Sequence, residues 1–320
     1  MSIYIEEPGM FTLIQDLGRW GFQSKGLTVS EPMDIFSLRI GNELLGNDEN
    51  AAAMEILLFG PEMVFKKACC IALTGADLGL TINGSPAEAW KAHTVEAGDK
   101  VAVTGMTGDG CRAYLCVSGG IDVPLVMGSR STYTRAQIGG KDGRPLQMGD
   151  ELPIGPLPDG WEKAAGFGCP EQFRGTAFRA EPLYAMDGPQ VDAFTEEGLK
   201  TFYSETYTVA DEVDRMGYRL DGPEIARFRG ADIISDGIVF GSVQVPGSGT
   251  PIVMMADRQT AGGYTKIAVV STWSVAQLAQ KLPGEPVRFA RVSEEEATNL
   301  LRRFEDMLGT LREQRKAYVG

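Results

Sequence analysis

Glycine content is the feature that most constrains how this chain can fold. Forty of its 320 residues are glycine, one in eight, against a usual share of about 7%. The glycines stand between apolar runs and show no period of three, which argues against disorder and excludes collagen. Together with 17 prolines they predict many tight turns, and therefore many short elements rather than a helix bundle.

Charge and histidine content narrow the classes of function. The chain carries 30 basic and 43 acidic residues, a net charge of −13, so we expect no nucleic-acid and no membrane partner. A single histidine, His93, cannot build a zinc site of two or three histidines, and we expect no metal site. No apolar run approaches the roughly 18 residues that a membrane span needs.

The five cysteines do not form a disulfide framework. Their number is odd, two are adjacent, and no CxxC spacing occurs. This usage is typical of small buried thiols in a reducing compartment. The N-terminus also lacks the basic and apolar regions of a secretion signal, so we expect a cytoplasmic protein.

The two halves of the chain share a loose plan of strand, helix and then short strands. In the first half we expect a helix that begins near Ser30 and ends before Gly46, and then β structure from about residue 55 to 117. Asn83-Gly84 between two strand-like runs predicts a hairpin. The second half restarts with an expected strand over 178–186.

Helices are also expected in the second half. One follows Pro189, and another covers about residues 275–282 before Pro283-Gly284. In the tail, Ser293 with Glu296 has the spacing of a capping box, and an apolar stripe follows it for roughly 20 residues. The stripe indicates a helix that packs on its own domain or, alternatively, docks a partner protein.

A shift in composition around residues 155–175, toward glycine, proline and charged residues, marks a domain boundary. We therefore expect an N-terminal β-barrel-like domain over 1–165 and a second domain over 176–292. A C-terminal amphipathic helix over 293–318 completes the prediction.

Two polar clusters in the second half are candidates for chemistry. Residues 211–219 combine three acids with two arginines, and residues 255–264 follow a strand of the buried type. Asp257 is suited to act as a base or orienter, Arg258 to clamp an anion and Gln259 to read an amide. The alternatives are a surface ion pair in the first cluster and a solvated turn in the second.

The first half holds two similar polar loops, at residues 16–21 and 128–135. Hydroxyl groups beside arginines suit an oxyanion or phosphate, and equally suit a well-bonded turn. The chain has no P-loop, no dinucleotide-binding glycine fingerprint and no lysine between two methionines, the usual site of biotin attachment. His93 lies in an expected hairpin and is interpreted as structural.

Seven motifs follow one another in a fixed order through the chain: Asp16-Leu17-Gly18-Arg19, Pro32-Met33-Asp34, Gly119-Gly120-Ile121-Asp122-Val123-Pro124, Gly128-Ser129-Arg130-Ser131-Thr132-Tyr133, Asp214-Arg215-Met216-Gly217-Tyr218-Arg219-Leu220, Ser235-Asp236-Gly237-Ile238 and Met255-Ala256-Asp257-Arg258-Gln259-Thr260. With them the chain resembles the biotin-dependent carboxyltransferase-like family. That family includes KipA, the KipA-related subunit of prokaryotic ATP-dependent 5-oxoprolinase, and the second half of the carboxyltransferase region of urea carboxylase.

The resemblance implies a mainly β fold with a few helices (α+β), built from tandem cyclophilin-like β-barrel domains. It implies a lactam hydrolase that converts 5-oxo-L-proline to L-glutamate, inactive without two partners, one KipI-like and one LamB/YcsF-like. Two alternatives stay open. One is a carboxyltransferase subunit that acts on urea or a related amide. The other is a non-catalytic KipA-type regulator that binds a KipI-like histidine-kinase inhibitor.

The resemblance also implies ligands and site residues. ATP, expected with Mg and bound by the complex, would activate the substrate, and biotin would serve a carboxyltransferase without attachment to this chain. The catalytic candidates are Asp214, Arg215, Asp257 and Arg258, in which the arginines hold phosphate or carboxylate and the acids orient water or a proton. The candidates for binding a small lactam or amide substrate are Arg19, Ser129, Arg130, Tyr218, Arg219, Gln244, Gln259 and Tyr264.

Overall fold

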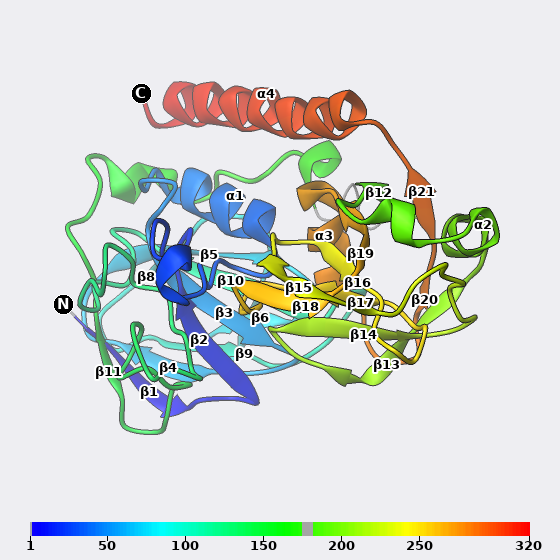
Figure 1. The fold of residues 1–320 in the computed structure, drawn as a ribbon. Helices are drawn as coiled ribbons and strands as arrows, with labels where there is room; N and C mark the ends of the chain where they lie inside the picture. The colour runs from blue at the N-terminus through cyan, green and yellow to red at the C-terminus, as the bar shows by residue number, and fades with distance from the viewer. Residues whose placement is uncertain (1, 175–181) are drawn as a thin grey trace. The chain divides into compact units, whose positions relative to one another are not determined.

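The computed structural model describes residues 2–174 and 182–320, which form 21 strands and four α-helices. The expected mainly β fold with a few helices is confirmed (Figure 1). The chain divides into two compact units. The first comprises Met1–Arg19, Ser30–Ala177 and Phe304–Gly320, and the second comprises Trp20–Val29 and Phe178–Arg303.

The first unit is built from two antiparallel sheets. The six-stranded sheet has the order β11 (Glu151–Pro153), β1 (Ser2–Glu7), β4 (Glu62–Phe65), β9 (Lys100–Val103), β6 (Leu80–Ile82) and β7 (Ser85–Ala87). The five-stranded sheet has the order β2 (Phe11–Gln15), β3 (Ala53–Leu57), β10 (Arg112–Val117), β5 (Cys69–Gly75) and β8 (His93–Val95). Apolar side chains of both sheets share one core, so the sheets pack face to face. The hairpin expected at Asn83-Gly84 joins β6 to β7 and is confirmed.

Strands β5 and β10 are buried along their whole length because both of their faces are covered. Alternate residues such as Leu73 and Leu115 enter the core between the sheets. The intervening residues face helix α1 (Ile35–Leu45): Thr74 Oγ1 donates to the Ser37 carbonyl at 2.7 Å. The five-stranded sheet is therefore the middle layer of this unit.

Helix α1 is fixed by caps that its sequence encodes. The Asp34 side chain accepts a hydrogen bond from the Ser37 amide at 3.0 Å, and Gly46 closes the helix in the left-handed conformation. The expected stop at Gly46 is confirmed. The predicted start near Ser30 is too early, because the capping carboxylate at Asp34 sets the first helical residue at Ile35.

The C-terminal helix α4 (Glu294–Val319) begins with the expected capping box, in which Glu296 Oε2 accepts from the Ser293 amide at 2.7 Å. Its bounds lie within one residue of the expected 293–318. Its residues from Phe304 onward belong to the first unit, where the Phe304 ring lies 4.4 Å from that of Phe36. Leu308 and Leu311 are also buried, so this part of the stripe packs on its own chain.

The second unit contains an eight-stranded sheet that closes almost completely on itself. Its order is β20 (Pro286–Val287), β13 (Tyr207–Val213), β14 (Gly217–Asp221), β17 (Ile252–Met254), β16 (Ser242–Gln244), β19 (Lys266–Val270), β12 (Leu183–Asp187) and β21 (Phe289–Arg291). The outermost strands β20 and β21 are separated by Arg288 alone, so the two ends of the sheet must lie close together. A separate ribbon pairs β15 (Asp232–Gly237) with β18 (Ala261–Tyr264).

Two helices accompany this sheet. Helix α2 (Glu196–Ser204) is capped by Thr195 and follows a short 3-10 turn after Pro189. Helix α3 (Thr272–Ala279) is capped by Ser271 and starts three residues before the expected position. Of the strand expected over 178–186, residues 178–181 lie outside the described residues, and β12 begins at Leu183.

The five cysteines are buried thiols, as expected. Burial raises the pKa of Cys69 to about 12, and burial likewise raises the pKa of Cys169 to about 12. These two thiols therefore stay protonated at neutral pH and serve as packing groups rather than nucleophiles.

Gly41 in α1 offers a test of the packing between helix and sheet. A Cβ at this position would lie 2.6 Å from Cys116 Sγ and 2.9 Å from Thr74 Oγ1. We expect Gly41→Ala to lower the free energy of unfolding by about 1 to 3 kcal/mol, since overpacking outweighs helix propensity. Urea denaturation measures this change.

Gly309→Ala is the matched control, because a Cβ on Gly309 of α4 meets nothing within 4 Å. It should raise the free energy of unfolding, by at most about 1 kcal/mol. Equal stabilisation by both substitutions would contradict the close contact of α1 with the sheet.

Candidate functional site

A buried ion pair joins Arg215 to Asp257. Arg215 lies just before β14 and Asp257 just after β17, and these strands pair with Gly217 opposite Met254, so the fold brings the two residues together. Nε of Arg215 is 3.0 Å from Oδ2 of Asp257, and Nη2 is 3.1 Å from Oδ1. The side chains are only 7% and 5% exposed. The contact is a two-point fork, the strongest geometry for this pair.

The other two catalytic candidates are placed differently. Asp214 is exposed, and its Oδ1 accepts from the amides of Met216 and Gly217, which closes the turn between β13 and β14. It therefore does not form the surface pair with Arg215 that the sequence left open. Arg258 is buried, with its guanidinium carbon 5.3 Å from the centre of the Phe240 ring.

The remaining candidates of the second unit vary in exposure. Tyr218 is buried, and its hydroxyl lies 3.4 Å from the carbonyl of Ala279, which suits a core residue. Arg219 is exposed and pairs with Glu212. Gln259 and Tyr264 are exposed, whereas Gln244 is buried at 5% exposure.

The candidates of the first unit belong to one network around Asp16. The Asp16 carboxylate accepts from the Ser129 hydroxyl at 2.6 Å and from the Arg130 amide at 2.5 Å. Arg19 is fully buried and donates to the carbonyls of Val126 and Ser131. These contacts hold the loop over residues 126–131 in place, which agrees with the well-bonded turn that its sequence allows.

Arg130 is the member of this network that reaches a pocket. Its Nη2 lies 2.5 Å from Oδ1 of Asp122, and both residues line a pocket of about 240 Å³ with Gly119, Gly120 and Gly155. Asp48 and Asn50 also line this pocket, so its wall carries both charged and polar side chains.

A second charge pair, not predicted from the sequence, joins a buried lysine to an exposed carboxylate. The side chain of Lys266, the first residue of β19, is 2% exposed, and its Nζ is 3.0 Å from Oδ2 of Asp236 in β15. Gln190 Nε2 also donates to that carboxylate at 3.2 Å. The hydrogen bond from Lys266 lowers the pKa of Asp236, with smaller help from the Gly237 amide and Gln190, so Asp236 is ionised at neutral pH. Asp236 belongs to one of the seven motifs, whereas Lys266 belongs to none of them.

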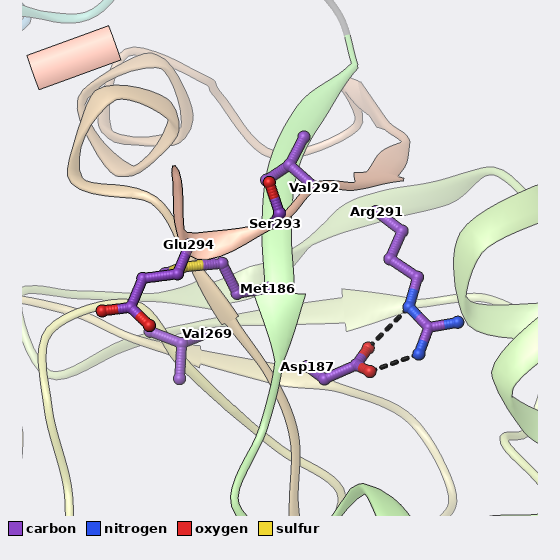
Figure 2. Close-up of a pocket in the computed structure, with 7 residues that line it drawn as sticks. All are labelled: Met186, Asp187, Val269, Arg291, Val292, Ser293 and Glu294. Carbon is purple, nitrogen blue, oxygen red and sulfur yellow. Dashed lines mark hydrogen bonds and ion pairs between the residues drawn. The ribbon is translucent and has the colours of Figure 1, made fainter. Parts of the chain in front are cut away.

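A third charge pair lines a pocket of about 670 Å³ in the second unit. Figure 2 shows the Arg291 guanidinium facing the Asp187 carboxylate, with Nε donating to Oδ1 at 2.8 Å. Tyr203 donates to the same carboxylate at 3.3 Å. The apolar side chains of Met186 and Val269 also line the pocket. This grouping could not be predicted from the sequence, because its residues come from separate elements.

No group of three or more histidine, cysteine or carboxylate side chains in residues 2–174 and 182–320 is placed to hold a metal ion. Among those same residues, no helix is long and apolar enough to cross a membrane.

Fold and sequence together define the class of this protein. Residues 25–291 match the family described as carboxyltransferase domain, subdomain A and B, and the chain belongs to that family. It is 38% identical to a 5-oxoprolinase subunit of Escherichia coli (strain K12) over 289 residues, which cover 90% of this chain and 91% of that protein.

Two further relatives are much larger proteins. The chain is 32% identical to the urea amidolyase of Saccharomyces cerevisiae, covering 93% of this chain and 17% of that protein. The crystal structure of the K. lactis urea amidolyase superposes with a TM-score of 0.89 and 29% identity, covering 97% of this chain and 20% of that chain. The chain thus spans about a fifth of the length of these relatives. The resemblance to the carboxyltransferase-like family is confirmed.

Removing one member of the Arg215–Asp257 pair should be costly, because the other charge stays buried. We expect Arg215→Ala to lower the free energy of unfolding by roughly 3 to 5 kcal/mol. Arg215→Met combined with Asp257→Leu should cost less, since neither charge remains. Urea denaturation compares the two.

Arg219→Ala serves as the matched control, because Arg219 pairs with Glu212 at the surface with 54% and 78% exposure. Its loss should change the free energy of unfolding by at most about 1 kcal/mol. If Arg215→Ala and Arg219→Ala lowered the free energy of unfolding by similarly small amounts, the stabilising role of the buried pair would be contradicted.

Proposed function

We propose that this chain is the KipA-related subunit of an ATP-dependent 5-oxoprolinase complex, which hydrolyses 5-oxo-L-proline to L-glutamate. The observation that carries the proposal is sequence identity. The chain is 38% identical to the Escherichia coli 5-oxoprolinase subunit over 289 residues, against 32% identity to the urea amidolyase of Saccharomyces cerevisiae over 317 residues.

The chemistry of the substrate explains why partners would be needed. A lactam is a poor electrophile, and phosphorylation of its oxygen, the chemistry that ATP supplies when bound by the complex, creates a leaving group. We assign ATP and Mg to the complex as a whole. A KipI-like protein and a LamB/YcsF-like protein are the proposed partners, in a cytoplasmic complex.

Within this scheme the residues of the chain bind and orient the substrate. Arg258 is the proposed anion clamp, since its guanidinium is buried beside Phe240 and desolvation strengthens its electrostatic effect. Arg215 and Asp257 hold each other in a fixed geometry that positions the neighbouring Arg258. Asp214, as an exposed turn residue, is the weakest of the four catalytic candidates.

A second candidate function is carboxyl transfer to urea or a related amide, favoured by the similarity to urea amidolyases. It requires carboxybiotin on another chain, because this sequence has no Met-Lys-Met tripeptide. A non-catalytic KipA-type regulator would bind the KipI-like protein without turnover. Addition of avidin distinguishes 5-oxoproline hydrolysis from carboxyl transfer, because it should stop carboxyl transfer and leave hydrolysis unchanged.

Arg258→Ala tests the proposed clamp. In a complex reconstituted with the KipI-like and LamB/YcsF-like partners, we expect it to lower kcat/KM for 5-oxoproline by a factor of about 100 or more, the size of a lost charge-assisted contact. ATP-dependent release of glutamate is the measurement.

Arg302→Ala is the matched control, because Arg302 is an exposed arginine of α4 that contacts only its helix neighbour Asn299 among the described contacts. It should leave turnover unchanged. Wild-type turnover by Arg258→Ala would remove this arginine from the site.

A further inference from the structure

Two buried hydrogen-bond donors lie opposite one another in the eight-stranded sheet. Gln244, the last residue of β16, is the register partner of Lys266, the first residue of β19. Side chains of directly opposed residues lie on the same face of a sheet. The two residues are 5% and 1% exposed.

The donors of this pair exceed the acceptors around them. Lys266 Nζ carries three N–H groups, and among the described residues its hydrogen-bond partner is Asp236. The amide nitrogen Nε2 of Gln244 is buried and has no partner within residues 2–174 and 182–320. Buried donors are nearly always satisfied, so a group of this kind points to a ligand that supplies the acceptor.

The net charge of the cluster formed by Lys266, Gln244 and Asp236 indicates which kind of acceptor the ligand would supply. The Lys266 ammonium is already neutralised by the Asp236 carboxylate, which Gln190 also holds. A second anion would leave the cluster with an excess of negative charge. A neutral acceptor, such as the carbonyl oxygen of an amide, takes the remaining donors without that penalty.

Gly262 of β18 packs directly against the Gln244 amide, with no room for a side chain between them. A Cβ on this residue would lie 2.8 Å from Gln244 Nε2 and 2.6 Å from Ile238 Cδ1. Gly237 on the partner strand β15 differs, because a Cβ there meets nothing within 4 Å. Position 262, beside the Gln244 amide, therefore requires a glycine, whereas position 237 on the partner strand does not.

We propose that Lys266 Nζ and Gln244 Nε2 bind the carbonyl oxygen of the substrate amide beside Gly262. The proposal rests on the function proposed above, since the lactam of 5-oxoproline supplies that oxygen. It adds Lys266 to the substrate-binding residues and gives Gln244 a specific atom to contact.

The test uses 2-pyrrolidinone, a lactam without a carboxylate, as the probe. Its dissociation constant for the reconstituted complex is measured by saturation-transfer NMR, which needs no turnover. Lys266→Met, Gln244→Met and Gly262→Ala should each weaken binding about tenfold, the size of one lost hydrogen bond. Since the Asp236 side chain is 53% exposed, Lys266→Met strands no buried charge and should fold.

Gly237→Ala and Lys100→Met are the controls, the latter because Lys100 forms exposed ion pairs with Glu6 and Glu62. Both should bind the probe as the wild type does. Unchanged binding in the three site variants, or no binding of the probe to the wild-type complex, would overturn the inference. If the site variants weaken binding but the wild-type complex does not hydrolyse 5-oxoproline, the proposed function alone fails.

Discussion

Closure of the eight-stranded sheet is the constraint on which the second unit depends. Its end strands β20 and β21 are joined through Arg288 alone, so the sheet leaves only a narrow gap between these two strands. Each of the other six strands has a fixed neighbour on both sides. The pairing of β14 with β17 places Arg215 at Asp257. The pairing of β16 with β19 places Gln244 opposite Lys266.

The buried polar groups of this unit fall into two kinds. Arg215 and Asp257 satisfy one another in a fork and stabilise the fold around the end of β17. Lys266 and Gln244 keep donors that the described residues do not fill. Buried hydrogen-bond donors without an acceptor lower the stability of a folded chain. Such donors are found most often where a ligand binds. We therefore interpret Arg215 and Asp257 as a structural pair, and Lys266 and Gln244 as a candidate binding pair.

Local features could be predicted from the sequence, and pairings between distant segments could not. The hairpin at Asn83-Gly84, the stop at Gly46 and the cap at Ser293 depend on a few adjacent residues and are confirmed. The ion pair of Lys266 with Asp236 joins two different sheets, so it depends on how the β15–β18 ribbon lies beside β19. The resemblance to a known family supplied the fold class. It did not show that Asp214 closes a turn while Asp257 holds Arg215.

The most direct test of the central claim omits this chain from the reconstituted system. The KipI-like and LamB/YcsF-like partners, ATP, Mg and labelled 5-oxo-L-proline are incubated with and without it, and labelled glutamate and ADP are counted. The account predicts glutamate and ADP in equal amounts when all three proteins are present, without any biotin carrier, and no glutamate when this chain is left out. Equal glutamate formation in its absence would contradict the account.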